Sequence, residues 1–178
     1  QILGAAKEKM LELVKNLAKG EEVESVVGGV PAFSVSGKVP YFPNLKDWDG
    51  FQVESFLREN FCQNVSVYND ADLAGLGESL YGAGKGSRIV AYIGVGTGVG
   101  GTIITDGKTD ANKYGFEPGF HVLDLTDGKT FEDLVSGRAM LEKYKKSAEE
   151  IGQEEIKKLL PALAAGLYNV IRFWSPDV

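Results

Sequence analysis

Residues 89–105 read IVAYIGVGTGVGGTIIT, which is two apolar runs joined by a glycine-dense turn. The nearly unbroken apolar run at 89–93 is typical of a strand covered on both faces, and residues 102–105 are predicted to form its hairpin partner. Successive glycines between 94 and 101 let backbone N–H groups approach an anion without obstruction by side chains. The stretch therefore predicts a phosphate-binding hairpin; a tight hairpin with bulges and no ligand is the alternative.

The glycine spacing resembles that of another class of enzyme, which its context excludes. Gly96, Gly98 and Gly101 fit the spacing of a dinucleotide-binding fingerprint. That fingerprint must open a helix, whereas residues 102–105, which follow it here, are predicted as a strand. A nicotinamide-dependent dehydrogenase is therefore not indicated.

Predicted strands alternate with helices along the rest of the chain, which indicates an α/β architecture with a mixed sheet. A short strand at 65–68 delivers Asn69 and Asp70 at its carboxyl end, and a helical pattern follows. An Asp at this place is positioned to accept a hydroxyl proton, although capping the following helix is its ordinary role. Glycines between 82 and 86 suggest a connection between two lobes, residues 1–86 and 87–178.

Composition excludes several other functions. The formal net charge of −6 disfavours nucleic acid as a partner, because such surfaces need clustered Lys and Arg. The single cysteine, Cys62, and the single histidine, His121, cannot assemble a zinc site or an internal disulfide from this chain alone. No apolar run approaches the roughly 20 residues that span a bilayer, so we expect a cytoplasmic protein with no membrane partner.

Several segments, in this order along the chain, resemble motifs of the ROK (repressor, open reading frame, kinase) family. Residues 29–32 and 37–48 are similar to loops that lie near the sugar in that family. Residues 68–78 resemble its Glu-Asn-Asp-Ala-Asn…Leu-Gly-Glu motif, and residues 95–108 its second phosphate-binding hairpin. Residues 131–139 resemble its Leu-Glu-x-x-x-Ser-Gly segment. The chain is thus identified as a glucokinase-like member of this family.

The resemblance implies a two-lobed sugar kinase with the actin-like ATPase, ribonuclease-H-like α/β fold and mixed sheets. It implies ATP-dependent phosphorylation of a hexose-like sugar, with Mg²⁺ accompanying the nucleotide, and it makes Asp70 the general base. The residues that it assigns to the ATP phosphates are Gly96, Thr97 and Gly98. The residues that it assigns to the sugar are Asn69, Glu117 and Glu132, with Asn44 and His121 as weaker candidates. A homodimer is also implied.

The chain departs from the family pattern in three places. Glu117 matches a Gly-Glu-Ile-Gly-His motif, but Phe120 stands where the family has its histidine and His121 is displaced by one residue. Residues 125–130 replace a cysteine-rich zinc loop and contain no cysteine, so no structural zinc is expected. The first phosphate loop and the adenosine-binding region have no counterpart, so we expect a chain truncated at both ends.

Two other functions stay open on the sequence. A sugar-sensing effector domain of a ROK-type transcriptional repressor would keep the sugar contacts and carry a DNA-binding domain before residue 1. A degenerate actin-like domain used for assembly would use Phe116, Phe120 and His121 for packing. The Asn69-Asp70 pair and the glycine hairpin favour the kinase, because a sensor has no need to bind ATP.

Overall fold

The computed structural model of the protein describes residues 3–32, 42, 45–110, 112, 115–146 and 148–178. The chain divides into two compact units, Gln1–Asp70 and Ala71–Val178, which are treated separately below. This division lies earlier in the chain than the expected boundary near residue 86, because the helix that starts at Asp70 packs within the second unit. The boundary at residue 86 between kinase lobes stays a prediction for the complete protein.

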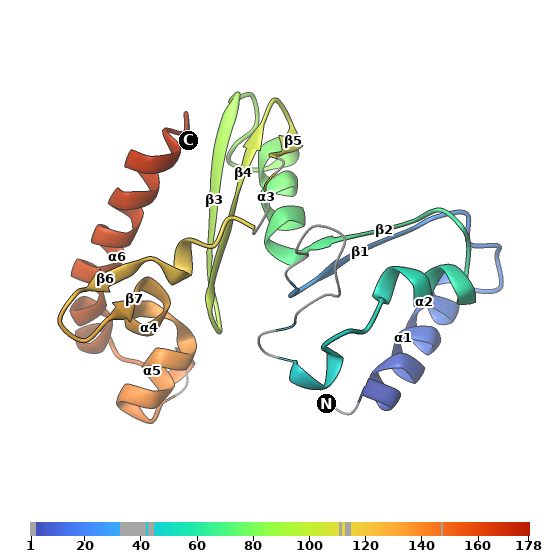
Figure 1. Ribbon diagram of the computed structural model, residues 1–178, viewed down its shortest axis with the longest axis horizontal. Coiled ribbons are helices and arrows are strands. Elements are labelled where there is room, and N and C mark those ends of the chain that lie inside the picture. Colours follow the sequence, from blue (N-terminus) through green and yellow to red (C-terminus); the bar gives the residue numbers. More distant parts are fainter. Residues whose placement is uncertain (1–2, 33–41, 43–44, 111, 113–114, 147) are drawn as a thin grey trace. The chain divides into compact units, whose positions relative to one another are not determined.

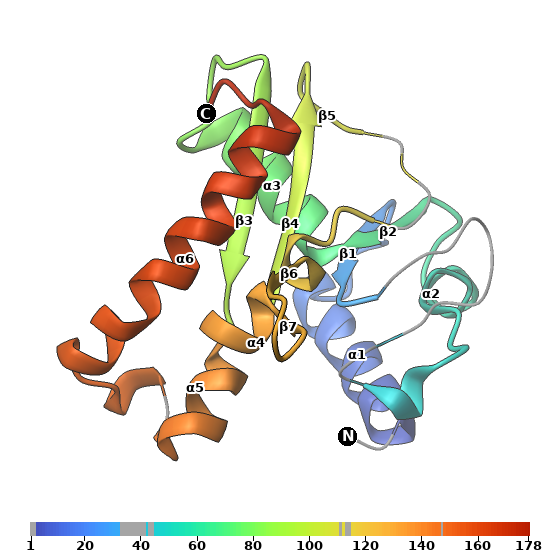
Figure 2. The ribbon, with the colours of Figure 1, turned by 60° about the vertical axis from the view of Figure 1, so that its left-hand side comes forward.

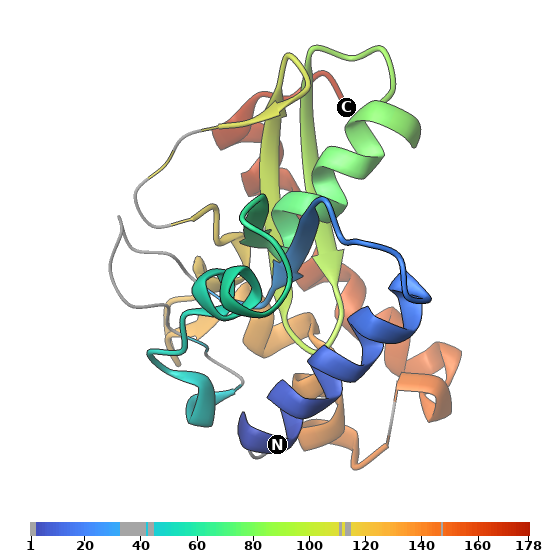
Figure 3. The same cartoon turned by 90° about the vertical axis from the view of Figure 1, so that its right-hand side faces the viewer.

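In its described residues, the first unit combines helices (blue and teal in Figure 3) with a parallel pair of strands. Its elements are α1 (Leu3–Ala18), β1 (Val26–Val30), η1 (Lys46–Trp48), α2 (Val53–Asn60) and β2 (Val65–Asn69). Val26 of β1 lies opposite Val65 of β2, and Val30 lies opposite Asn69. The parallel pairing therefore brings the carboxyl ends of both strands to the same edge of the sheet.

Aromatic side chains form much of the core of the first unit. Trp48 is buried and its ring centroid lies 5.6 Å from those of Phe42 and Phe51. Val53 and Leu57 of α2 are buried in the same cluster, which also contacts the apolar face of α1. This packing holds α2 against the sheet.

The second unit is built around an antiparallel sheet. Strand β3 (Ile89–Val95) pairs with β4 (Val99–Thr105), and β4 pairs with the short β5 (Lys108–Thr109). Val95 lies opposite Val99, which confirms the hairpin and its turn at residues 96–98. Main-chain hydrogen bonds of Asp177 and Val178 with Ile89 and Ala91 continue the sheet on the other side of β3.

Helices cover both faces of the β3–β4 hairpin (Figures 1 and 2). Helix α3 (Asp70–Tyr81) lies on one face and α6 (Gln153–Trp174) on the other. Six short elements follow β5 and precede α6 in the sequence. They are η2 (Pro118–Phe120), β6 (Val122–Asp124), β7 (Lys129–Thr130), α4 (Phe131–Val135), α5 (Gly137–Tyr144) and η3 (Ala148–Glu150). Among the described helices, none is both long and apolar enough to cross a bilayer.

Phe131 is the centre of the core of this unit. It is fully buried at the start of α4, where it packs with Val99 of β4 and Val135. Gly166 of α6 meets the face of its ring, and a Cβ at position 166 would overlap that ring. The contact lets α6 approach α4 closely, and it ties both helices to the glycine hairpin through Val99.

Candidate active site

The predicted base, Asp70, and a predicted sugar contact, Asn69, lie where β2 passes directly into α3. Asn69 is the last residue of β2, and its Nδ2 donates a hydrogen bond to the carbonyl of Ala32, 3.2 Å away. Asp70 is the first residue of α3 and is exposed. The carboxylate therefore lies at the carboxyl end of a strand, where sequence reasoning expected it.

The start of α3 lies next to the glycine hairpin. Ala71 follows Asp70, and a Cβ added to Gly100 of β4 would lie 3.5 Å from the Cβ of Ala71. This distance is an ordinary van der Waals contact, so the first turn of the helix lies beside the strand. The residue after the proposed base is therefore a neighbour of the proposed phosphate-binding segment.

The glycine turn is held by main-chain hydrogen bonds from a neighbouring helix. The N–H groups of Gly137 and Arg138, at the start of α5, donate to the carbonyls of Gly96 (2.8 Å) and Thr97 (3.2 Å). Within the turn, the N–H of Gly96 donates to the carbonyl of Gly98 (2.9 Å). Two carbonyls of the turn are thus directed at α5.

One side of the same turn is open. A Cβ added at Gly96 would meet no other atom within 4 Å, and Thr97 is exposed. The open side leaves space for a phosphate group beside the turn, and such a group needs backbone amides that it can approach closely. The structure brings Gly96, Thr97 and Gly98 into one turn, as the sequence predicted.

Glu132, predicted to bind sugar, is engaged with the hairpin. Its Oε2 accepts a hydrogen bond from the N–H of Val99 at 2.7 Å, and its Oε1 lies 2.5 Å from Nη2 of Arg138. The residue is buried within α4. Sequence reasoning missed Arg138. The available signal was a cation six residues after Glu132, just after the helix start at Ser136–Gly137.

Glu117 and His121 share a pocket of about 190 Å³ in the second unit. Its aromatic lining includes Phe116 and Trp174, whose ring centroids lie 5.5 Å apart. The imidazole of His121 packs 5.3 Å from the ring of Phe131, and its buried Nε2 has no hydrogen-bond partner among the described residues. The displaced histidine is thus brought into the same pocket as the matching glutamate.

The remaining predicted contacts cannot all be placed together. Asn44 lies outside the described residues, and Asn69 belongs to the first unit. Where the family has its zinc loop, β6 and β7 pair as a short hairpin, with Val122 opposite Thr130. In the described part of the chain, no group of three or more His, Cys, Asp or Glu side chains is placed to hold a metal ion.

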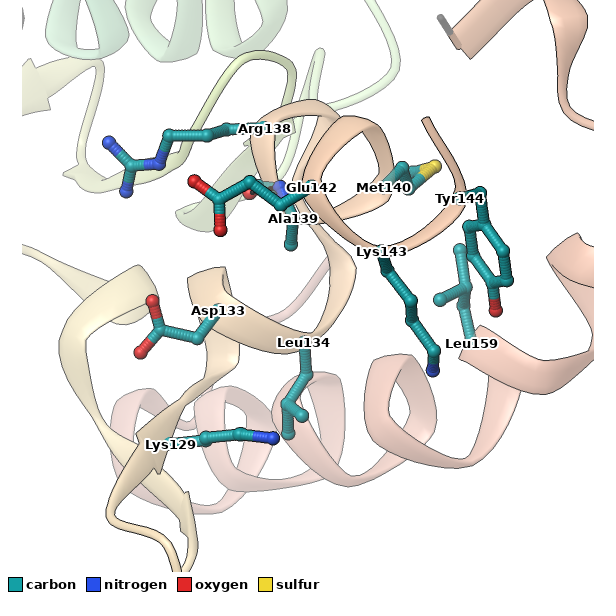
Figure 4. A pocket seen from close by; sticks show the side chains of 11 residues that line it. Lys129, Asp133, Leu134, Arg138, Ala139, Met140, Glu142, Lys143, Tyr144 and Leu159 are labelled. Atoms are coloured by element: carbon teal, nitrogen blue, oxygen red, sulfur yellow. Dashed lines mark hydrogen bonds between the residues drawn. The ribbon is translucent and has the colours of Figure 1, made fainter. Parts of the chain in front are cut away.

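A larger open pocket of about 470 Å³ lies along α4 and α5 (Figure 4). Charged side chains line it, among them Lys129, Asp133, Arg138 and Lys143. Hydrogen bonds from the backbone and side chain of Thr130 hold the pKa of Asp133 below its ordinary value. These bonds form a capping box at the start of α4, so the Asp133 carboxylate already serves the helix.

Comparison with known proteins gives a family match over nearly the whole chain. The family model described as ROK matches residues 5–174. An uncharacterized protein of Clostridium perfringens is 28% identical over 195 residues, covering 95% of this chain and 66% of that protein. A glucokinase of Streptomyces coelicolor is 31% identical over 158 residues, covering 83% of this chain and 49% of the enzyme.

The match includes regulators as well as enzymes. A xylose repressor of Caldicellulosiruptor bescii is 30% identical over 187 residues, covering 90% of this chain and 46% of the repressor. The crystal structure of a ROK family glucokinase from Streptomyces griseus, in complex with glucose and AMPPNP, aligns with a TM-score of 0.78 and 22% identity. That alignment covers 98% of this chain and 70% of the glucokinase.

These comparisons confirm the fold expected from the sequence. The mixed α/β architecture is that of the actin-like sugar kinases, over the part of the fold that this chain spans. The chain spans between 46% and 66% of the length of the three curated relatives named above.

Proposed function

The chain belongs to the ROK family, and from this premise we propose that the complete protein transfers the γ-phosphoryl group of ATP to a hydroxyl of a hexose-like sugar. The observation that carries the proposal is the contact between Ala71 and Gly100. It brings the helix that begins with Asp70 against the strand that follows the glycine turn. A proton acceptor and a phosphate-binding turn on adjoining segments are what phosphoryl transfer to an alcohol requires.

Asp70 acts in this proposal as the general base. Its exposed carboxylate accepts the proton of the sugar hydroxyl as the oxygen attacks the γ-phosphorus. Asp70 is the first residue of α3, so its carboxylate lies at the N-terminal end of that helix. The hydrogen bond from Asn69 to Ala32 fixes the end of β2 and so holds the backbone on which Asp70 stands.

The turn residues Gly96, Thr97 and Gly98 bind the ATP phosphates through backbone amides and the Thr97 hydroxyl. ATP binds with Mg²⁺, which supplies neutralisation of the charge that develops on the transferred group. Asn69, Glu117 and Glu132 hydrogen-bond the sugar hydroxyls, and Asn44 and His121 contribute further contacts. Buried polar partners of this kind discriminate between sugars, because a wrong epimer leaves one of them unpaired.

The test is a coupled ADP-release assay on the complete protein with ATP, Mg²⁺ and a panel of hexoses, N-acetylhexosamines and fructose. We expect ADP release that depends on one class of sugar. Release that is equal with and without every sugar, while a sugar still binds, would contradict the proposal. Light scattering on the same sample tests the homodimer, and fractionation of cells tests the cytoplasmic location.

A second candidate is the sugar-sensing domain of a transcriptional repressor. The xylose repressor that matches 90% of this chain favours it. A sensor would bind sugar without ATP turnover, and the complete protein would bind operator DNA through a domain outside these residues. A gel-shift assay with promoter DNA, with and without sugar, separates it from the kinase.

A further inference from the structure

We propose that Glu132 and Arg138 form a positioning pair that fixes the glycine turn at residues 96–99 for phosphate recognition. The inference rests on the proposed function, because it assigns these two side chains to the nucleotide side of the same reaction. Arg138 acts through Glu132 and the turn, and it is a positioning residue. The proposal extends the role of Glu132 beyond the sugar contact that the sequence suggested.

Three hydrogen bonds connect the segment 132–138 with the turn, and a side-chain ion pair joins Glu132 to Arg138 within the segment. Val99 N–H donates to Oε2 of Glu132 at 2.7 Å, and Nη2 of Arg138 contacts Oε1 at 2.5 Å. The main-chain N–H groups of Gly137 and Arg138 donate to the carbonyls of Gly96 and Thr97. The segment thus holds the turn through the carbonyls of Gly96 and Thr97 and the N–H of Val99.

The carboxylate of Glu132 is largely buried, so its pairing with Arg138 helps to hold it against the turn. The side chain of Glu132 is 12% exposed, whereas that of Arg138 is 46% exposed. A carboxylate removed from water needs partners for its charge, and a charged acceptor strengthens the hydrogen bond from Val99. Arg138 reaches from the solvent side to place a positive charge against Oε1, and Oε2 stays directed at the turn.

Gly98 shows how closely the carboxylate and the turn are fitted. A Cβ at position 98 would overlap Oε2 of Glu132. A side chain at position 98 would therefore displace the carboxylate, whereas Gly96 faces open space. The two glycines divide the turn into a side held by Glu132 and a side left open for a ligand.

The hydrogen bonds from segment 132–138 act on the glycine turn, so we expect them to affect binding of ATP more than binding of sugar. The carbonyls of Gly96 and Thr97 accept from α5, so that helix start is used by the turn and is not left to a ligand. Each carboxylate oxygen has two acceptor sites, so Glu132 can hold the turn and still accept a sugar hydroxyl. Loss of Arg138 therefore loosens the phosphate turn first.

The test compares the KM values for ATP and sugar in the complete protein. Arg138→Met is expected to raise the KM for ATP about three- to tenfold, as expected for a weakened charge-assisted hydrogen bond, and to leave the KM for sugar within twofold. Arg138→Lys is expected to restore part of the loss, because the charge returns without the planar fork. Lys146→Met is the control: Lys146 is also 46% exposed and pairs with Glu155 at 3.0 Å, away from the turn.

Binding of Mg·AMPPNP, measured by calorimetry, separates failure of this inference from failure of the proposed function. Weaker binding to Arg138→Met than to the wild type supports the pair whether or not a sugar is phosphorylated. Wild-type binding without sugar phosphorylation would contradict the proposed kinase alone. Unchanged nucleotide binding by Arg138→Met, or a rise in the KM for sugar alone, would contradict the positioning role of the pair. A wild-type protein that binds no nucleotide would contradict it as well.

Discussion

Gly75 of α3 lies directly against Thr102 of β4, with no room for a side chain between them. A Cβ at position 75 would overlap Cγ2 of Thr102, which is 1% exposed, and would lie 3.0 Å from the Cβ of Tyr92. The helix backbone therefore packs directly on side chains of β4 and β3. This contact sets the position of the helix start, including Ala71, beside the hairpin.

Gly75→Ala is expected to lower the free energy of unfolding by about 1–3 kcal/mol, because Thr102 is short, branched and buried and cannot move aside. Gly77→Ala is the matched control in the same helix, since a Cβ there meets nothing within 4 Å. That change is expected to stabilise the protein by about 0.5–1 kcal/mol through helix propensity. Urea unfolding measures both, and equal effects would show that α3 does not pack on β4 in this way.

Gly96→Ala separates phosphate binding from folding. The added methyl group meets nothing in the protein, so the urea midpoint should stay near that of the wild type. In the proposed site the same methyl group obstructs the approach of a phosphate, so we expect the KM for ATP to rise by about tenfold or more. An unchanged KM for ATP in the folded variant would remove the turn from the nucleotide site.

Asp133 gives the protein an acid-sensitive helix cap. Its pKa is lowered by bonds from Thr130, so the stabilisation is present at neutral pH and is lost as the pH falls below about 4. Asp133→Asn should lower stability at pH 7 by about 0.5–1 kcal/mol, because the carboxylate is exposed to solvent. The difference from wild type should shrink on acidification, as followed by thermal unfolding.

The partner of this cap provides the control for that prediction. Thr130→Ala removes the hydroxyl that donates to Asp133 and that accepts from its N–H. The double variant should lose less than the sum of the two single losses, since both act on one capping box. Strict additivity at pH 7 would mean that the two side chains stabilise α4 independently.

Asp70→Asn should lower turnover by about 10²- to 10⁴-fold with the fold intact, because an amide cannot accept the hydroxyl proton. Asp72→Asn is the control two residues further along α3, and it introduces the residue that the family motif carries at this place. We expect its turnover within a few-fold of wild type. Comparable losses in both variants would point to a role for Asp70 in holding α3 rather than in catalysis.

Local patterns predicted the parts of the site that depend on neighbours in sequence. The hairpin around residues 96–98 and the strand end at Asn69 follow from apolar runs, glycines and turn chemistry, and the structure confirms both. The grip of Glu132 on Val99 could not be predicted, because it joins residues 33 positions apart. Such a contact depends on how α4 packs on β4, which the periodicity of either segment does not contain.

The extent of β1 shows a second limit of local reasoning. Glycine is depleted in strands, yet β1 runs from Val26 to Val30 and includes Gly28 and Gly29. Pairing with β2 over its whole length holds Gly28 and Gly29 in the strand. Tertiary pairing overrides the low strand propensity of glycine here, as it commonly does.

The most direct measurement of the central claim is mass spectrometry of the sugar after incubation of the complete protein with Mg·ATP. We predict that one class of hexose-like sugar gains a single phosphoryl group in step with ADP release, and that Asp70→Asn forms almost none of this product. A wild-type protein that binds sugar and Mg·ATP together but returns every sugar unphosphorylated would contradict the account.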